Sequence, residues 1–215
     1  MNLLKLPKNE VGKDFVIGDI HGNFSGVKDK LREIGFEKSK DRLISVGDLV
    51  DRGAESHHVL EWLDYEWFYP VQGNHENMAI RFPEGRMDEV NYAMNGGIWF
   101  LSLPEREQKQ ISDALSYLPL AIEVETNFGR TGIVHAEVPS NDWLFITETM
   151  NRKLKSTCQW GREKISSMDE KHVSNIDRVF VGHTPVDEPV KLGNVMYIDT
   201  AGWHNTGYFT VVRIQ

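Results

Sequence analysis

Residues 15–22 read FVIGDIHG, a short apolar run that ends in a glycine and then in two polar side chains. The run from Phe15 to Ile17 is brief and rich in β-forming residues, so it predicts a buried strand. Asp19 and His21 follow it, two positions apart. If extended geometry continues beyond the strand, both side chains lie on one face and can share a metal ion.

The same arrangement recurs along the chain. Further short apolar runs occupy residues 43–46, 68–71, 133–134, 179–181 and 196–198. Polar side chains follow the first four of these runs, namely Asp48, Asn74, His75, His135 and His183. Open α/β sheets place ligands just beyond the carboxyl ends of their strands, so the pattern predicts one site built from several strand ends. Glycines at positions 18, 47, 73 and 182 indicate tight turns or close backbone approach there.

Helical patterns lie between several of the predicted strands. Asn23 or Ser25 can cap a helix that ends at Gly35. A second helix is expected over residues 55–66, and residues 102–105 have the spacing of a capping box that begins a third. Alternation of strand and helix predicts βαβ units in the first half, whereas the second half is more mixed, with a loop-rich stretch around 140–156. An α/β sandwich is the expected architecture.

Composition limits the class of protein. The chain has 215 residues, with 24 Lys and Arg against 32 Asp and Glu, and a formal charge of −8. Its length and the lack of a linker predict a single domain over residues 1–215. The acidic balance argues against nucleic acid as a partner, since such binding depends on basic side chains. No apolar stretch approaches the roughly 20 residues that span a bilayer, so no membrane partner is expected.

The expected compartment is the cytoplasm. The N-terminal segment becomes polar too quickly for a signal peptide. Cys158 is the one cysteine and can form no internal disulfide, which suits a reducing environment. Nothing near it supplies the Cys-His arrangement of thiol catalysis, so Cys158 is interpreted as a packing residue.

Carboxylates and imidazoles together suit manganese, iron, zinc and related ions, and the lack of cysteine ligands argues against a thiolate site. Asp48 can bridge two ions, because a carboxylate has two oxygens and enough charge to offset the repulsion between dications. Asn74, His135 and His183 would then complete a second site. Two ions about 3.5–4 Å apart can hold a hydroxide and clamp a phosphoryl group during in-line attack.

Three blocks of sequence resemble a known family: residues 18–22, 47–53 and 73–76 look like the signature blocks of the phosphoprotein phosphatase branch of the metallophosphoesterases. The resemblance extends through residues 135–136, 160–163 and 182–185, and so covers most of the chain. The short length, with the segments 95–97 and 160–163, is most similar to the compact bacterial and bacteriophage-lambda-type serine/threonine protein phosphatases. The resemblance implies a calcineurin-like metallophosphoesterase fold, a β-sandwich of mixed sheets flanked by helices.

The resemblance also implies two divalent metal ions, preferably Mn²⁺, with Fe, Zn, Ni or Co as the other candidates. Asp19, His21 and Asp48 would hold the first ion, and Asp48, Asn74, His135 and His183 the second.

The same resemblance assigns the catalytic roles. A hydroxide that bridges the ions is the nucleophile, and His75 is the general acid that protonates the leaving alkoxide, with Asp51 orienting its ring. Arg52 and Arg162 match phosphate-binding arginines. An imidazole that titrates near pH 6.5 can donate a proton at neutral pH, and a carboxylate partner favours its charged form. Guanidinium forks can grip phosphate oxygens bidentately.

Two positions differ from the family's pattern. Glu137 follows residues 135–136 where the lambda-type enzymes commonly carry Asp, and Gly161 replaces a bulkier polar residue before Arg162. Glu137 can change how the residues that support the metal ligands are arranged. Gly161 can make the loop that carries Arg162 less rigid.

The implied activity is hydrolysis of phosphoserine and phosphothreonine, with phosphotyrosine as a further class, in phosphoprotein or phosphopeptide substrates. Three alternatives stay open: a symmetrical dinucleoside tetraphosphate hydrolase, another metallophosphoesterase such as a phosphodiesterase, and a non-catalytic phosphate-binding module. The last should have lost His75, Asp51 or a ligand, and this chain retains them all. The sequence leaves the native metal pair and the oligomeric state open.

Overall fold

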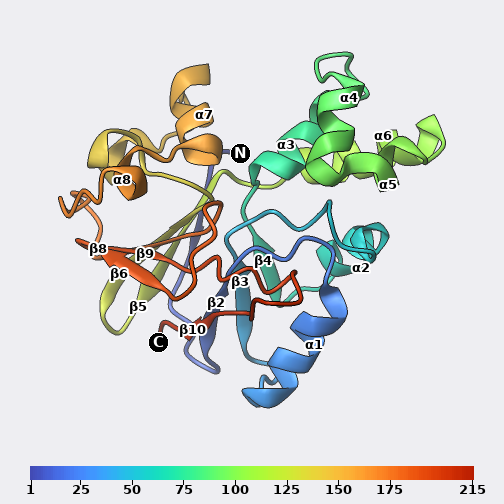
Figure 1. The fold of residues 1–215 in the computed structure, drawn as a ribbon. Helices are drawn as coiled ribbons and strands as arrows, with labels where there is room; N and C mark the ends of the chain where they lie inside the picture. The colour runs from blue at the N-terminus through green and yellow to red at the C-terminus, as the bar shows by residue number, and fades with distance from the viewer.

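The computed structural model describes residues 1–215 and is built on two β-sheets that pack face to face, with helices on their outer sides (Figure 1). In sheet order, the six-stranded sheet consists of β1 (Leu3–Leu6), β5 (Ala121–Thr126), β6 (Gly129–Val134), β7 (Arg178–Val181), β9 (Val195–Tyr197) and β8 (Val190–Leu192). The four-stranded sheet consists of β10 (Val211–Arg213), β2 (Asp14–Ile17), β3 (Arg42–Ser45) and β4 (Phe68–Pro70). Both sheets are mixed, which confirms the fold class expected from the sequence.

Strand direction brings several carboxyl ends to one edge. In the smaller sheet, β2, β3 and β4 are parallel, and only β10 runs against them. In the larger sheet, β6, β7 and β9 are parallel to one another. The turns that follow β2, β3, β4, β6 and β7 hold the polar residues singled out in the sequence.

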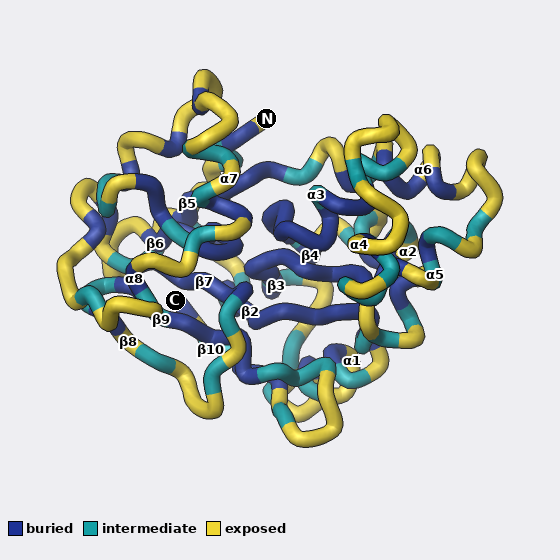
Figure 2. Tube along the Cα trace, turned by 45° about the horizontal axis from the view of Figure 1, so that its top comes forward, coloured by how far each residue is buried: buried dark blue, intermediate teal, exposed yellow.

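Three apolar layers hold the fold together. Eleven buried residues fill the space between the sheets, including Val16, Ile44 and Phe180. Phe15 and Leu43, which precede Val16 and Ile44 in the sequence, face the opposite side of the smaller sheet. They pack into a cluster beneath the helices that cover this sheet. Both faces of β2 and β3 are therefore buried, which explains why these strands read as continuous apolar runs. Figure 2 shows the buried chain concentrated in the central strands and the exposed chain in the surrounding loops and helices.

The third layer lies on the outer face of the larger sheet and includes Trp143 and Cys158. Cys158 is fully buried, as expected of a packing residue, and burial raises the pKa of its thiol to about 12.

The longer helices cover the outer faces of the sheets, and short helical turns join them. The α-helices are α1 (Phe24–Glu33), α2 (Val59–Leu63), α3 (Asn74–Arg81), α4 (Glu89–Tyr92), α5 (Ile98–Leu101), α6 (Glu105–Ser116), α7 (Arg152–Trp160) and α8 (Glu163–Ser166). The short turns are η1 (Ser56–His58), the π-turn η2 (Ala93–Gly97), η3 (Pro139–Asn141) and η4 (Trp143–Phe145). No helix combines the length and the apolar character needed to cross a bilayer.

Helix boundaries test the capping predictions. Asn23, one of the two candidates, caps α1 by accepting a hydrogen bond from the Gly26 N–H at 3.1 Å. The helix expected over 55–66 is shorter, because it consists of η1 followed by α2. The capping box at 102–105 is wrong: α6 begins after Pro104, and the Ser102 hydroxyl donates to the Trp99 carbonyl instead.

Truncating Ile44, which is fully buried between the sheets, should lower the free energy of unfolding by about 2–5 kcal/mol, because it leaves a cavity that packed neighbours cannot fill. The matched control is Ile98→Ala: this side chain is 66% exposed, and its truncation should change stability by less than about 0.5 kcal/mol. Urea unfolding measures both. Equal destabilisation by the two variants would contradict the layer assignment.

Candidate active site

The residues expected to bind metal come together where the parallel strands end. Asp19 follows β2, Asp48 follows β3, and Asn74 begins α3 after β4. His135 follows β6 and His183 follows β7, so both sheets contribute. All six expected ligands, including His21, are between 0 and 6% exposed.

Sharp turns, not extended strands, aim these side chains. Ten non-glycine residues have positive φ, and half of them are candidate site residues: His21, Asp48, Asp51, Arg52 and His183. The expectation that Asp19 and His21 share a face through continued strand geometry is therefore wrong, since His21 has φ of 43°. The His21 Nε2 atom nevertheless lies 3.9 Å from the nearer Asp19 oxygen. Backbone conformations of this kind are costly, and they cluster at functional sites.

Glycines permit close approach at two strand ends. A Cβ on Gly182 would lie 1.9 Å from Asp19 Oδ1, and one on Gly73 would lie 2.1 Å from Asp48 Oδ1. Side chains at these positions would occupy the space of the carboxylates. The predicted close approach is confirmed at both positions.

Asp48 connects the two halves of the site. Its Oδ2 lies 3.6 Å from His21 Nε2 and 3.9 Å from His75 Nε2. Its Oδ1 lies 3.3 Å from His135 Nε2, and Asp48, His135 and His183 form a second buried group able to hold a cation. The two oxygens thus face different groups, which is the geometry required of a bridging carboxylate.

Hydrogen bonds fix which imidazole nitrogens face the centre. His21 Nδ1 lies 3.0 Å from the Val50 carbonyl, and His135 Nδ1 lies 2.7 Å from the Val46 carbonyl. A carbonyl accepts only, so each Nδ1 carries a proton, and Nε2 is the nitrogen whose lone pair a metal ion would use when the ring is neutral. Nε2 of His183 is buried without any hydrogen-bond partner. An orphaned, buried nitrogen beside a carboxylate fits a metal ligand.

The electrostatics of the site favour bound cations. Burial lowers the pKa of His21 well below its usual value, and the charge of His75 adds to this effect. Burial and the charge of His135 lower the pKa of His183 to about 3, so both rings are neutral ligands at neutral pH. Burial, with Asp199 and Asp48, raises the pKa of Asp19 well above its usual value. A divalent cation would relieve this crowding of carboxylates.

The donor set therefore fits two metal ions of the kind that carboxylate, imidazole and amide ligands prefer. Asn74 Oδ1 lies 2.8 Å from His135 Nε2, in place for the second ion. Grouping by distance places His75, and not Asp19, with His21 and Asp48. The assignment of Asp19 as the ligand and of His75 as the proton donor therefore belongs to the proposal below.

His75 and Asp51 form a buried pair. His75 Nδ1 donates to Asp51 Oδ2 at 2.7 Å. The other carboxylate oxygen accepts from Trp99 Nε1 at 2.7 Å and from the Tyr92 hydroxyl at 3.3 Å. Asp51 is thus held through both carboxylate oxygens. A carboxylate held in this way fixes the orientation of the imidazole ring.

Arg52 lies over the site. Its guanidinium stacks on the Trp203 ring at 4.7 Å, and its Nη1 donates to His21 Nε2 at 3.0 Å. That nitrogen lone pair is the one a first metal ion would use, so the guanidinium stands where a cation would bind. The Arg52 N–H donates to the Gly96 carbonyl, which shows how the segment 95–97 supports this turn.

Arg162 lies on the opposite side, beside His183. It donates weakly to the Thr184 hydroxyl at 3.3 Å and to the His183 carbonyl at 3.5 Å, and it is exposed. No carboxylate oxygen lies within 4.0 Å of it, so its charge is free to meet an anion. Trp160 lies two positions before Arg162, and its ring centroid is 6.2 Å from that of His183.

Glu137 and Gly161, the two residues that differ from the family's pattern, lie next to each other in the structure. A Cβ on Gly161 would lie 2.6 Å from Glu137 Cβ. Glu137 Oε2 accepts a hydrogen bond from the Glu163 N–H at 2.9 Å, next to Arg162. Gly161 thus leaves room for the Glu137 side chain, which holds the loop that carries Arg162.

Sequence reasoning missed three contributors to the site. Asp199 follows β9 just as the other polar residues follow their strands, and its Oδ2 is buried without a partner. Glu76 accepts hydrogen bonds from the N–H groups of Gly73, Asp48 and Leu49 at 2.7–2.9 Å, which fixes the turn around Asp48. The position of Asp199 just after a strand predicts a polar role for it, and Glu76 lies within the block 73–76, whereas Trp203 carries no signal in the sequence.

Comparison with known proteins agrees with this geometry. The model of the calcineurin-like phosphoesterase family matches residues 15–187. The chain is 34% identical over 208 residues to serine/threonine-protein phosphatase 2 of Escherichia coli K12, covering 94% of this chain and 92% of that protein. It is 29% identical to the asymmetrical bis(5'-nucleosyl)-tetraphosphatase PrpE of Geobacillus thermodenitrificans, covering 86% and 84%. A solved serine/threonine phosphatase from Saccharomyces cerevisiae superimposes with a TM-score of 0.62 at 18% identity, covering 91% of this chain and 70% of that one.

The chain therefore belongs to the calcineurin-like phosphoesterase family, and it is an enzyme of that class. Within the family, its expected resemblance to the compact bacterial serine/threonine protein phosphatases is confirmed.

Substituting Gly182 by alanine should displace the Asp19 carboxylate, because the new Cβ would overlap it and also lie 2.5 Å from Val46 Cγ2. Mn²⁺ affinity, measured by titration calorimetry, should fall by about 10–100-fold. Gly35→Ala is the control: no atom lies within 4 Å of its Cβ, but its φ of +65° disfavours a side chain. That variant should lose about 1 kcal/mol of stability and keep its metal affinity. Unchanged Mn²⁺ binding in Gly182→Ala would refute the role given to Asp19.

Proposed function

We propose that this enzyme is a serine/threonine protein phosphatase that hydrolyses phosphoserine and phosphothreonine monoesters, with phosphotyrosine as a further class. One observation carries the proposal: the buried His75–Asp51 pair adjoins the carboxylate of Asp48, which faces two groups of metal-capable side chains. A proton donor placed beside such a centre suits cleavage of an alkyl phosphate, whose leaving group needs a proton. The Escherichia coli relative is named for this activity.

In this proposal Asp19, His21 and Asp48 hold one divalent ion, and Asp48, Asn74, His135 and His183 hold the other. The ions would supply Lewis acidity and lower the pKa of water, so that hydrolysis needs no covalent intermediate. Mn²⁺ is our preferred identity, because neutral imidazole, carboxylate and amide oxygen all suit it.

The chain's own residues handle the proton and the anion. His75 donates its Nε2 proton to the departing alkoxide, while Asp51 holds Nδ1 and keeps the ring oriented. Arg52 and Arg162 approach the centre from opposite sides and bind the phosphate oxygens. In this structure Arg52 donates to His21 Nε2, the atom that a metal ion would use. To bind phosphate, its guanidinium must move away from His21 while it stays over the Trp203 ring.

We further propose that the chain acts as one domain in the cytoplasm on phosphoprotein substrates. The layer between the sheets is built from both halves of the chain, which supports a single unit. A single buried thiol with no disulfide is consistent with a reducing compartment.

Replacing His75 by asparagine should lower kcat on a phosphothreonine peptide by about 10²–10⁴-fold, because the alkoxide then leaves without its proton. With p-nitrophenyl phosphate, whose leaving group is stable as an anion, the loss should stay within about tenfold. His172→Asn, an exposed histidine outside the site, is the matched control and should change neither rate. Equal losses on both substrates would show that His75 binds metal or substrate and is not the acid.

The strongest competing function is hydrolysis of dinucleoside tetraphosphates, which the sequence left open in its symmetrical form. The Geobacillus relative carries the asymmetrical version of that activity in its name. Metal-depleted enzyme reloaded with Mn²⁺ should cleave a phosphothreonine peptide with a higher kcat/KM than diadenosine tetraphosphate. Preference for the dinucleotide would replace our assignment, and inactivity with every divalent ion would refute both.

A further inference from the structure

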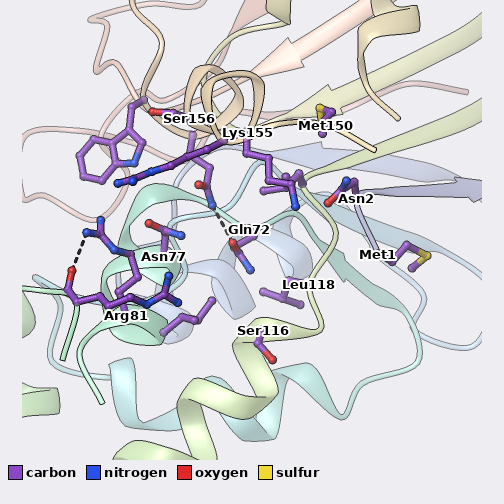
Figure 3. A pocket seen from close by; sticks show the side chains of 16 residues that line it. Met1, Asn2, Gln72, Asn77, Arg81, Ser116, Leu118, Met150, Lys155 and Ser156 are labelled. Atoms are coloured by element: carbon purple, nitrogen blue, oxygen red, sulfur yellow. Dashed lines mark hydrogen bonds between the residues drawn. The ribbon is translucent and has the colours of Figure 1, made fainter. Parts of the chain in front are cut away.

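A groove with basic walls lies beside the metal-capable centre, between α3 and α7 (Figure 3). Its volume is about 800 Å³. Figure 3 shows Arg81 and Asn77 on one side, Lys155 and Ser156 on the other, and Gln72 between them. We call it the α3–α7 groove.

The groove shares a wall with the site. Gln159, buried at the end of α7, donates to Gln72 Oε1 at 2.8 Å and to the Gly73 carbonyl at 3.4 Å. Gly73 directly precedes the ligand Asn74. Trp160 lines the groove and also approaches His183. A segment of a substrate protein next to a phosphate at the centre would therefore lie near the groove, on the side of Trp160.

The charge of the groove is opposite to that of the whole chain. Four cations line it, namely Arg81, Arg86, Arg152 and Lys155, and none of its 16 lining residues is acidic. Arg86 pairs with Glu84, but the other three have no carboxylate oxygen within 4.0 Å. In a protein with eight more acidic than basic residues, three unpaired cations around one hollow are unexpected. Their charge is available to a ligand.

Helix α7 strengthens this effect. Its first turn carries Arg152, Lys153 and Lys155 and no acidic residue. A helix N-terminus carries partial positive charge and normally favours acidic side chains, so basic residues there oppose the helix dipole. A bound anion would relieve this repulsion as well as pair with the cations.

We propose that the α3–α7 groove binds an acidic segment of the substrate protein, next to the phosphorylated residue. This inference rests on the proposed phosphatase function and specifies its substrate class. Asn77, which is half-buried and makes no side-chain hydrogen bond within the protein, offers an amide donor and acceptor that suit a peptide backbone. Trp160 is the one aromatic residue in the lining, so the groove offers no pair of rings on which the bases of a dinucleotide or nucleic acid could stack.

Three phosphothreonine peptides of equal length test the proposal. One carries three acidic residues before the phosphothreonine, one carries them after it, and one has serine and asparagine at all of these positions. At low salt, one acidic peptide should exceed the neutral peptide in kcat/KM by about fivefold to tenfold, mainly through KM. The advantage should shrink in 0.5 M NaCl, because salt screens exposed charges.

A matched pair of double variants locates the effect. Arg152→Gln with Lys155→Gln should bring the ratio of acidic to neutral peptide close to one. Arg106→Gln with Lys191→Gln removes two exposed cations that do not line the groove, and it should keep the wild-type ratio. A folding defect lowers the rates for all peptides together and leaves the ratio unchanged.

Equal rates for acidic and neutral peptides, or a full preference in the groove variant, would overturn the inference while leaving the phosphatase function intact. Cleavage of diadenosine tetraphosphate but of none of the peptides would overturn both. The neutral peptide thus distinguishes failure of the groove inference from failure of the phosphatase function, because its hydrolysis depends on the phosphatase function and not on the groove.

Discussion

Burying Asp48 among other charged groups is the constraint on which the rest of the site depends. Its two oxygens face different sets of imidazoles, and each set comes from turns at the ends of separate strands. Burial opposes ionisation of Asp48, but the charges of His135 and His75 outweigh it and hold its pKa well below the usual range. Asp19 and Asp199 lie close by, without enough positive charge to balance them. The fold thus brings together a charge distribution that divalent cations would complete.

The turns that hold this arrangement are strained, and buried hydrogen bonds keep them in place. Asp48, Asp51 and Arg52 all have positive φ, each at a cost on the order of 1–3 kcal/mol. Glu76 offsets part of that cost, because its carboxylate satisfies successive N–H groups in the turn around Asp48. Removing it would leave buried donors without partners, which costs about 1–3 kcal/mol for each group. Glu76 therefore serves the geometry of the site without facing the substrate.

The sequence predicts the fold class and the set of converging residues, because both follow from short-range patterns. Apolar runs identify the buried strands, and the polar residue after each run identifies the edge where they meet. The reason first given for pairing Asp19 with His21 was wrong, since a left-handed turn replaces extended chain there. Contacts between distant segments were beyond prediction: nothing local indicates that Gly161 makes room for Glu137, or that Trp203 stacks on Arg52. Asp199 follows the apolar run 196–198 and so obeys the same local pattern as the other polar residues at strand ends.

Local charge, and not the total of −8, governs what this enzyme can bind. Arginines, the α3–α7 groove and bound metal would make one face attractive to phosphate on an acidic molecule. The central claim is that Asp48 bridges two cations, and a crystal structure of the Mn²⁺-loaded enzyme with anomalous scattering tests it most directly. We expect two manganese peaks about 3.5–4 Å apart, one on each side of the Asp48 carboxylate, with Arg52 withdrawn from His21 Nε2. A single peak, or two peaks that do not share Asp48, would contradict the account.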